Sequence, residues 1–129
     1  MAPSHPAGPG HLLLFEKWMD TTKWLLERTQ RFPRALRHTL TDRIESLTLQ
    51  FLELVTQAAY RRDRAAPLRE ANDVLNRLRV LLRVAHELKV LSGAQYEEVT
   101  TRLSEAGKML GAWMRPASVG DDSGGEVTA

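Results

Sequence analysis

Arginines are the side chains with the clearest chemistry in this sequence, and they gather in two places. The first group recurs every three residues, with no acid between Glu27 and Asp42, and comprises Arg28, Arg31, Arg34 and Arg37. The second group is interrupted only by Asp63 and comprises Arg61, Arg62 and Arg64. A guanidinium presents a planar fork of donors that matches phosphate and carboxylate oxygens. Both groups therefore predict surfaces for an anionic partner, with nucleic acid the first choice.

A third polar group recurs at spacings of three and four residues, which places its members on one stripe of a helix. The stripe comprises Asn72, Asn76, Arg79, Arg83 and His86. Amide, guanidinium and imidazole groups all suit contacts with phosphates or base edges. We therefore add Arg79, Arg83 and His86 to the candidate binding residues. The alternative is that each charged run is a solvated helix face.

The sequence offers little for catalysis or metal binding. It contains no cysteine, which excludes a disulfide framework, a thiol nucleophile and Cys-ligated metals. It has no glycine-rich phosphate loop, no Gly-x-Ser-x-Gly turn, and no Glu followed three residues later by His, the pair that di-iron bundles use. Its histidines are His5, His11, His38 and His86. We predict no catalytic residue, no metal site and no cofactor, and hence a protein that is not an enzyme.

Length and charge indicate one globular domain with a basic middle. The chain has 129 residues, 43% of them hydrophobic, which fits a single domain with a core. Between Arg28 and Lys89 there are 13 basic and 7 acidic residues, whereas the segment after Arg115 holds three acids and no base. Prolines interrupt the uncharged N-terminal stretch, so neither a signal peptide nor a membrane span is expected. We expect a soluble, cytoplasmic protein without a membrane partner.

Apolar residues recur at spacings of three and four from residue 12 to residue 115, with no strand-like alternation, which predicts an all-α fold. We expect helices over residues 12–30, 34–61, 67–91 and 92–115, the last opened by a capping box at Ser92 and Gln95 and ending before Pro116. Short connections favour an antiparallel up-down four-helix bundle. Residues 1–11 and 116–129 are rich in Pro, Gly, Ala and Ser, so we predict a flexible N-terminal tail and a disordered acidic C-terminal tail.

Several small or apolar residues fall outside the expected core edges and predict self-association. They are Trp24, Val80 and Val84, together with Gly107 and Gly111, whose stripe of small residues lets another helix approach closely. We expect these residues at a homo-oligomer interface. The alternative is that they pack within a slightly wider monomeric bundle.

Three runs of sequence carry a resemblance to a known family. They are FEKWMDTTKWLLERTQRFPR at residues 15–34, LNRLRVLLRVAHELKVLSGAQYE at 75–97, and GKMLGAW at 107–113. Over about residues 15–115 the chain resembles the accessory variability determinant (Avd) proteins of diversity-generating retroelements. The Phe-Glu-Lys-Trp opening, the Arg-Phe-Pro corner and the Leu-Ser turn before Gln-Tyr-Glu occur together and in order.

The resemblance implies a four-helix-bundle protomer in a basic, pentameric barrel that binds the element's reverse transcriptase and its template RNA, and possibly DNA. It also implies a non-catalytic accessory role in mutagenic reverse transcription and retrohoming. The matched positions are Arg28, Arg31, Arg34, Arg79, Arg83 and His86. An alternative is the related four-helix family encoded in ribosomal-RNA intervening sequences, which would act as an oligomeric protein scaffold. Its typical Asn-Ile-Ala-Glu-Gly segment is replaced here by RIESLTLQFLELV, so it fits less well.

Overall fold

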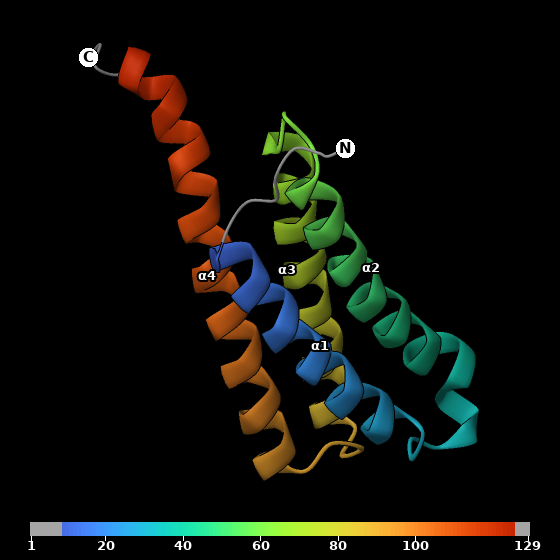
Figure 1. Ribbon diagram of the computed structural model, residues 1–129. Helices are drawn as coiled ribbons and strands as arrows, with labels where there is room; N and C mark the ends of the chain where they lie inside the picture. The colour runs from blue at the N-terminus through green and yellow to red at the C-terminus, as the bar shows by residue number, and fades with distance from the viewer. Residues whose placement is uncertain (1–8, 126–129) are drawn as a thin grey trace.

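The computed structural model describes the backbone of residues 9–125 and the side chains of residues 10–115 (Figure 1). Its four α-helices are α1 (Pro9–Thr29), α2 (Asp42–Ala59), α3 (Ala65–Glu87) and α4 (Gly93–Gly125), and this described part contains no strand. The predicted all-α four-helix fold is therefore confirmed. Within residues 9–125, no helix combines the length and the apolar run that crossing a bilayer requires.

The helices form an antiparallel bundle in which each one packs against two neighbours. α1 contacts α2 and α4, and α3 contacts the same two helices from the other side. In Figure 1 the α1–α2 corner and the α3–α4 turn lie at one end of the bundle, whereas the α2–α3 link lies at the other. Sequence groups near residues 30 and 62 are consequently far apart in space.

The core is built from the apolar stripes that the helical spacing predicts. Trp18 of α1 lies 4.4 Å from Phe51 of α2 between ring centroids, and its indole Nε1–H donates to the Thr48 carbonyl at 2.9 Å. α1, α3 and α4 add leucines that are 0–1% exposed, among them Leu14, Leu25, Leu75, Leu78, Leu82, Leu103 and Leu110. The bond from Trp18 fixes the height at which α1 packs on α2, because it satisfies the one polar atom of a buried ring.

Both ends of the bundle differ from the predicted boundaries. α1 begins at Pro9, so residues 9–11 are helical, and the His11 ring is buried between Phe15 and Trp113. α4 continues through Pro116 to Gly125 although its end was expected before the proline. A proline removes one helical hydrogen bond without necessarily ending a helix. The rest of the predicted tails, residues 1–8 and 126–129, lies outside the described residues.

The connection from α1 to α2 is not the continuous α-helix that we expected from Arg34. A 3-10 turn, η1, covers Arg34–Leu36, and a π-helical turn, η2, covers Arg37–Thr41 before α2 begins at Asp42. Leu40 and Thr41 are buried in this π turn, whereas Arg34, Arg37 and His38 are exposed.

The α3–α4 turn is fixed by hydrogen bonds at both of its ends. Val90 donates to the Ala85 carbonyl at 3.0 Å and Lys89 to the His86 carbonyl at 2.9 Å, which is a Schellman motif with Lys89 at a φ of 65°. The predicted capping box then opens α4, because Gln95 N–H donates to Ser92 Oγ at 3.1 Å and Ser92 N–H donates to Gln95 Oε1 at 3.0 Å.

Candidate nucleic-acid interface

The ten predicted binding residues do not form one surface. Arg28, Arg31, Arg34 and Arg37 lie at the α1–α2 corner, whereas Arg61, Arg62 and Arg64 lie at the α2–α3 link, at the opposite end of the bundle. Arg79, Arg83 and His86 lie along α3, on the side that approaches α4. The three groups are therefore separate surfaces.

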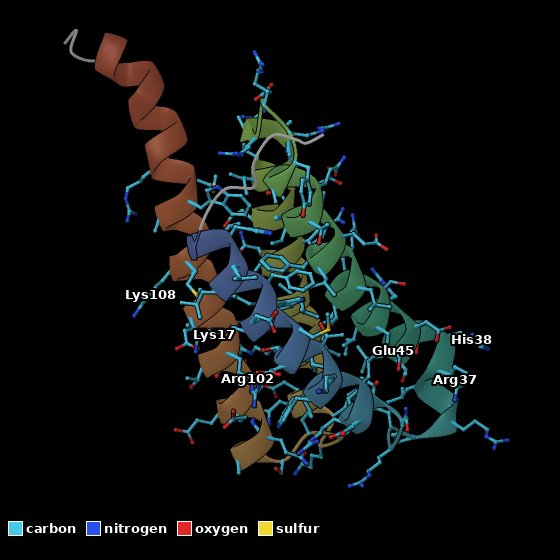
Figure 2. The ribbon with its side chains drawn as sticks, viewed as in Figure 1. Lys17, Arg37, His38, Glu45, Arg102 and Lys108 are labelled. Carbon is cyan, nitrogen blue, oxygen red and sulfur yellow. The ribbon has the colours of Figure 1, made fainter. Side chains whose placement is uncertain are left out.

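The group at the α1–α2 corner offers three exposed arginines, Arg31, Arg34 and Arg37, which we call the basic corner. Within the described residues none of the three makes an ion pair. Figure 2 shows Arg37 and His38 projecting away from the bundle at this corner. Three unpaired guanidinium groups on seven consecutive residues give a concentrated positive charge that an anion can approach from solvent.

Arg28 belongs to the same run in the sequence but has a different environment. Its guanidinium lies 4.3 Å from the centroid of the Trp24 ring, and its Nη1 pairs with Glu27 at 3.3 Å. Arg102 of α4 approaches the same ring at 5.5 Å. Trp24, which we expected at an oligomer interface, is therefore half-buried and covered by arginines of its own chain.

Two contacts hold the basic corner against the bundle. The Thr29 hydroxyl, at the end of α1, donates to Glu45 Oε2 of α2 at 2.6 Å. The Phe32 ring is buried directly before Pro33, so the chain is pinned on the core between Arg31 and Arg34. The backbone next to Arg31 is thus held on the bundle before and after that residue, which limits the entropy lost when a partner binds.

The three arginines at the α2–α3 link have two different environments. Arg61 and Arg62 are exposed, and neither makes an ion pair within the described residues. Arg64 Nε instead donates to the Ala58 carbonyl at 3.1 Å and satisfies a carbonyl in the last turn of α2. This end consequently presents two free arginines where the basic corner presents three.

The stripe along α3 is largely occupied by contacts within the chain. Arg79 donates to Asn76 Oδ1 at 2.9 Å and to the Leu103 carbonyl of α4 at 3.4 Å. The His86 ring stacks on Tyr96 of α4 at 4.4 Å with an interplanar angle of 1°. Arg83 is exposed and pairs with Glu87 at 3.6 Å. Arg79 and His86 therefore connect α3 to α4, a role that helical periodicity could not reveal.

The glycine stripe on α4 also has an internal use. A Cβ added at Gly107 would lie 3.2 Å from Arg79 Nη2 and 3.5 Å from Leu75 Cδ2, so this glycine makes room for the α3 side chains. A Cβ added at Gly111 would lie 3.9 Å from Arg115 Nη1, and apart from its chain neighbours no other described side chain comes within 4 Å. Of the predicted interface residues, Val80 and Val84 remain plainly exposed, at 62% and 39%.

The face between α1 and α4 carries basic residues that acids neutralise. Lys17 pairs with Glu105 at 3.6 Å, and Arg102 pairs with Glu98 at 2.8 Å. Figure 2 shows Lys17 and Arg102 on this face, far from Arg37. Among the side chains that the structure describes, no three His, Asp or Glu gather closely enough to hold a metal ion.

The described residues therefore form a helical-bundle protein with an exposed basic corner. A protein-family model described as bAvd-like matches residues 12–117, which is most of the chain. The chain belongs to this bAvd-like family, and the resemblance to Avd proteins is confirmed. No curated protein matches the sequence.

Proposed function

We propose that this chain is a non-catalytic accessory protein of a diversity-generating retroelement. In this proposal it binds the element's reverse transcriptase and template RNA, and supports mutagenic reverse transcription and retrohoming as a homo-oligomer, a pentamer in the family pattern. Membership of the bAvd-like family is the observation that carries the proposal. The structure adds a candidate contact surface, the basic corner formed by Arg31, Arg34 and Arg37.

The basic corner suits RNA because its charge is exposed, makes no ion pair within the described residues and lies next to backbone that Thr29 and Phe32 hold on the bundle. Each guanidinium that contacts a phosphate releases condensed counterions, and this release supplies much of the affinity. The same forks can grip carboxylates on an acidic face of a polymerase. One surface can therefore contribute to both contacts, either in one complex or in successive ones.

Binding assays with a corner variant and a matched control test the proposal. The variant combines Arg31→Ala, Arg34→Ala and Arg37→Ala, and the control combines Arg61→Ala and Arg62→Ala at the opposite end. Template RNA and purified reverse transcriptase are titrated separately against each full-length protein. We expect the corner variant to lose at least about tenfold in affinity for one of them, since each lost phosphate contact weakens binding, and the control to stay within about threefold of the parent chain.

Two results would overturn the proposal in different ways. If the corner variant binds both partners as tightly as the parent chain, the basic corner is not the contact surface. If the parent chain binds neither partner at low salt yet self-associates, the accessory role fails and a protein scaffold is the better account. Circular dichroism of each variant checks that helix content is unchanged.

A further inference from the structure

One exposed apolar surface runs along α3. Val80, Val84 and Leu88 are 62%, 39% and 52% exposed and follow one another at intervals of four residues, so they form a strip about 12 Å long. Sequence periodicity singled out the two valines but not Leu88. Shallow grooves flank the strip on both sides, and Val80 lines each of them. We call these three residues the α3 strip.

A second apolar surface lies between α1 and α2. A groove there is lined by Phe15, Leu52, Glu53, Thr56 and Gln57. Leu49, 41% exposed, lies one turn before Leu52 and Glu53, and Leu12, 58% exposed, lies one turn before Phe15. Leu49 to Thr56 spans about 10 Å of α2, which is close to the length of the strip. We call this surface the α1–α2 groove.

The grooves beside the α3 strip contain four arginines and two acids, and these acids, Asp42 and Glu87, already pair with His38 and Arg83, whereas acids alone border the α1–α2 groove. Arg43 and Arg77 line a groove beside the α3 strip, and Glu53 lines the α1–α2 groove, with Glu16 exposed next to Phe15. Within the described residues, none of these four side chains takes part in an ion pair. Apolar strips of similar length with complementary borders are what a specific protein contact requires.

The two surfaces cannot meet within one molecule. The α3 strip is exposed on the outer side of α3, and α3 already packs on α2 and α4 through its buried stripe. The α1–α2 groove opens between α1 and α2, and α1 lies in front of α3 in Figure 1. Only another copy of the chain brings one of these surfaces to the other.

We propose that the α3 strip of one copy packs into the α1–α2 groove of the next, in a head-to-tail contact. This inference rests on the proposed homo-oligomer and goes beyond it, because it assigns the two faces that meet. A heterologous contact of this kind builds a closed ring when the rotation closes. It places Arg77 and Arg43 of one copy opposite Glu53 and Glu16 of its neighbour.

A mixing experiment tests the pairing. The strip is blocked by Val80→Glu with Val84→Glu, and the groove by Leu49→Glu with Thr56→Glu, all at exposed positions. The matched control is Leu13→Glu. Leu13 is 52% exposed, within the range of the blocked positions, but it lies about 100° around α1 from Leu12. Light scattering gives the mass of each full-length protein at micromolar concentration, and circular dichroism checks helix content.

We expect each blocked protein to be monomeric and the control to assemble as the parent does. We expect an equal mixture of the two blocked proteins to form a dimer and nothing larger. The dimer arises because one intact strip and one intact groove remain between two partners. If either blocked protein still assembles, or the mixture stays monomeric while the parent assembles, the pairing is wrong and the homo-oligomer stands. If the parent chain itself is monomeric, the proposed homo-oligomer fails as well.

Discussion

The arginines of this chain have different roles, and the surroundings of each guanidinium determine its role. Arg31, Arg34 and Arg37 point to solvent without an ion pair among the described residues, whereas Arg64 and Arg79 donate to backbone carbonyls. A hydrogen-bonded guanidinium has to break its internal contacts before it can bind a phosphate, and this lowers its net contribution. The exposed arginines are therefore the ones that we assign to binding.

The Thr29–Glu45 hydrogen bond is the contact that we expect to anchor the basic corner. Thr29→Val keeps the shape of the side chain and removes the hydroxyl that donates to Glu45 at 2.6 Å. Because the acceptor is charged and Thr29 is buried, we expect a loss of about 1 to 3 kcal/mol in the free energy of unfolding. Urea unfolding measures the loss. Thr29→Ser, which retains the donor, should recover most of it, and equal losses in both variants would show that this bond is not the cause.

His11 makes the stability of the fold depend on pH. Burial, and then the positive charge of Arg64, lower the pKa of His11 below its usual value of 6.5. Its Nδ1 is buried and has no hydrogen-bond partner among the described residues, and the same holds for Nε1 of the neighbouring Trp113. The unfolded chain therefore binds the proton more readily than the folded one, so this stabilising contribution is complete above pH 6.5 and is lost as pH falls through the folded-state pKa.

Thermal unfolding at pH 7.5 and pH 5.5 tests the role of His11. His11→Phe keeps an aromatic ring against Phe15 and Trp113 but cannot take up a proton. We expect the parent chain to lose more stability than this variant on acidification, while carboxylates shared by both proteins cancel in the comparison. Identical losses in the two proteins would exclude His11 as the source of the pH dependence.

At the scale of elements, the α3–α4 turn contains one strained backbone position, which a substitution can relieve. Lys89 has a φ of 65°, in the left-handed region that a side chain with a Cβ disfavours. Lys89→Gly relieves this strain, and we expect a gain of about 0.5 to 1 kcal/mol in the free energy of unfolding. Urea unfolding of Lys89→Ala serves as the control, since alanine removes the charge but keeps the Cβ. An equal gain in that variant would attribute the effect to charge.

The elements themselves could be predicted from the sequence because helical spacing, Pro33 and the capping residues are local signals. Four helices, their antiparallel order and the Ser92–Gln95 capping box follow from those signals alone. The π turn before Asp42 and the helix beyond Pro116 could not be predicted, because packing and local compensation decide them. A proline makes the end of a helix more probable, but the packing around it in the folded protein decides whether the helix ends there.

The candidate site was less predictable than the fold for a related reason. Spacing on a helix says which side chains share a stripe, but it does not say what packs against that stripe. Arg79 meets the Leu103 carbonyl and Gly107 of α4, and Trp24 is covered by Arg28 and Arg102. These contacts join residues more than 20 positions apart in most cases, and no single-helix pattern contains them. The clustering of the basic corner was predictable because its three arginines lie within seven residues of sequence.

At the scale of the whole molecule, the basic corner and the two apolar surfaces involve different side chains. The basic corner lies at the end of the bundle that also holds the α3–α4 turn, and the α3 strip reaches this same end, whereas the α1–α2 groove lies nearer the opposite end. An assembly of several copies would bring several basic corners together and so offer more guanidinium groups to one RNA. Such multivalency raises avidity without any new type of contact.

The salt dependence of RNA binding tests the central claim most directly, because its slope counts phosphate contacts. Template RNA affinity is measured from about 50 to 200 mM salt for the parent chain and for the variant that combines Arg31→Ala, Arg34→Ala and Arg37→Ala. We predict steep loss of affinity with salt for the parent and a slope shallower by about 2 to 3 for the variant. Equal slopes in the two proteins would contradict the assignment of RNA binding to the basic corner.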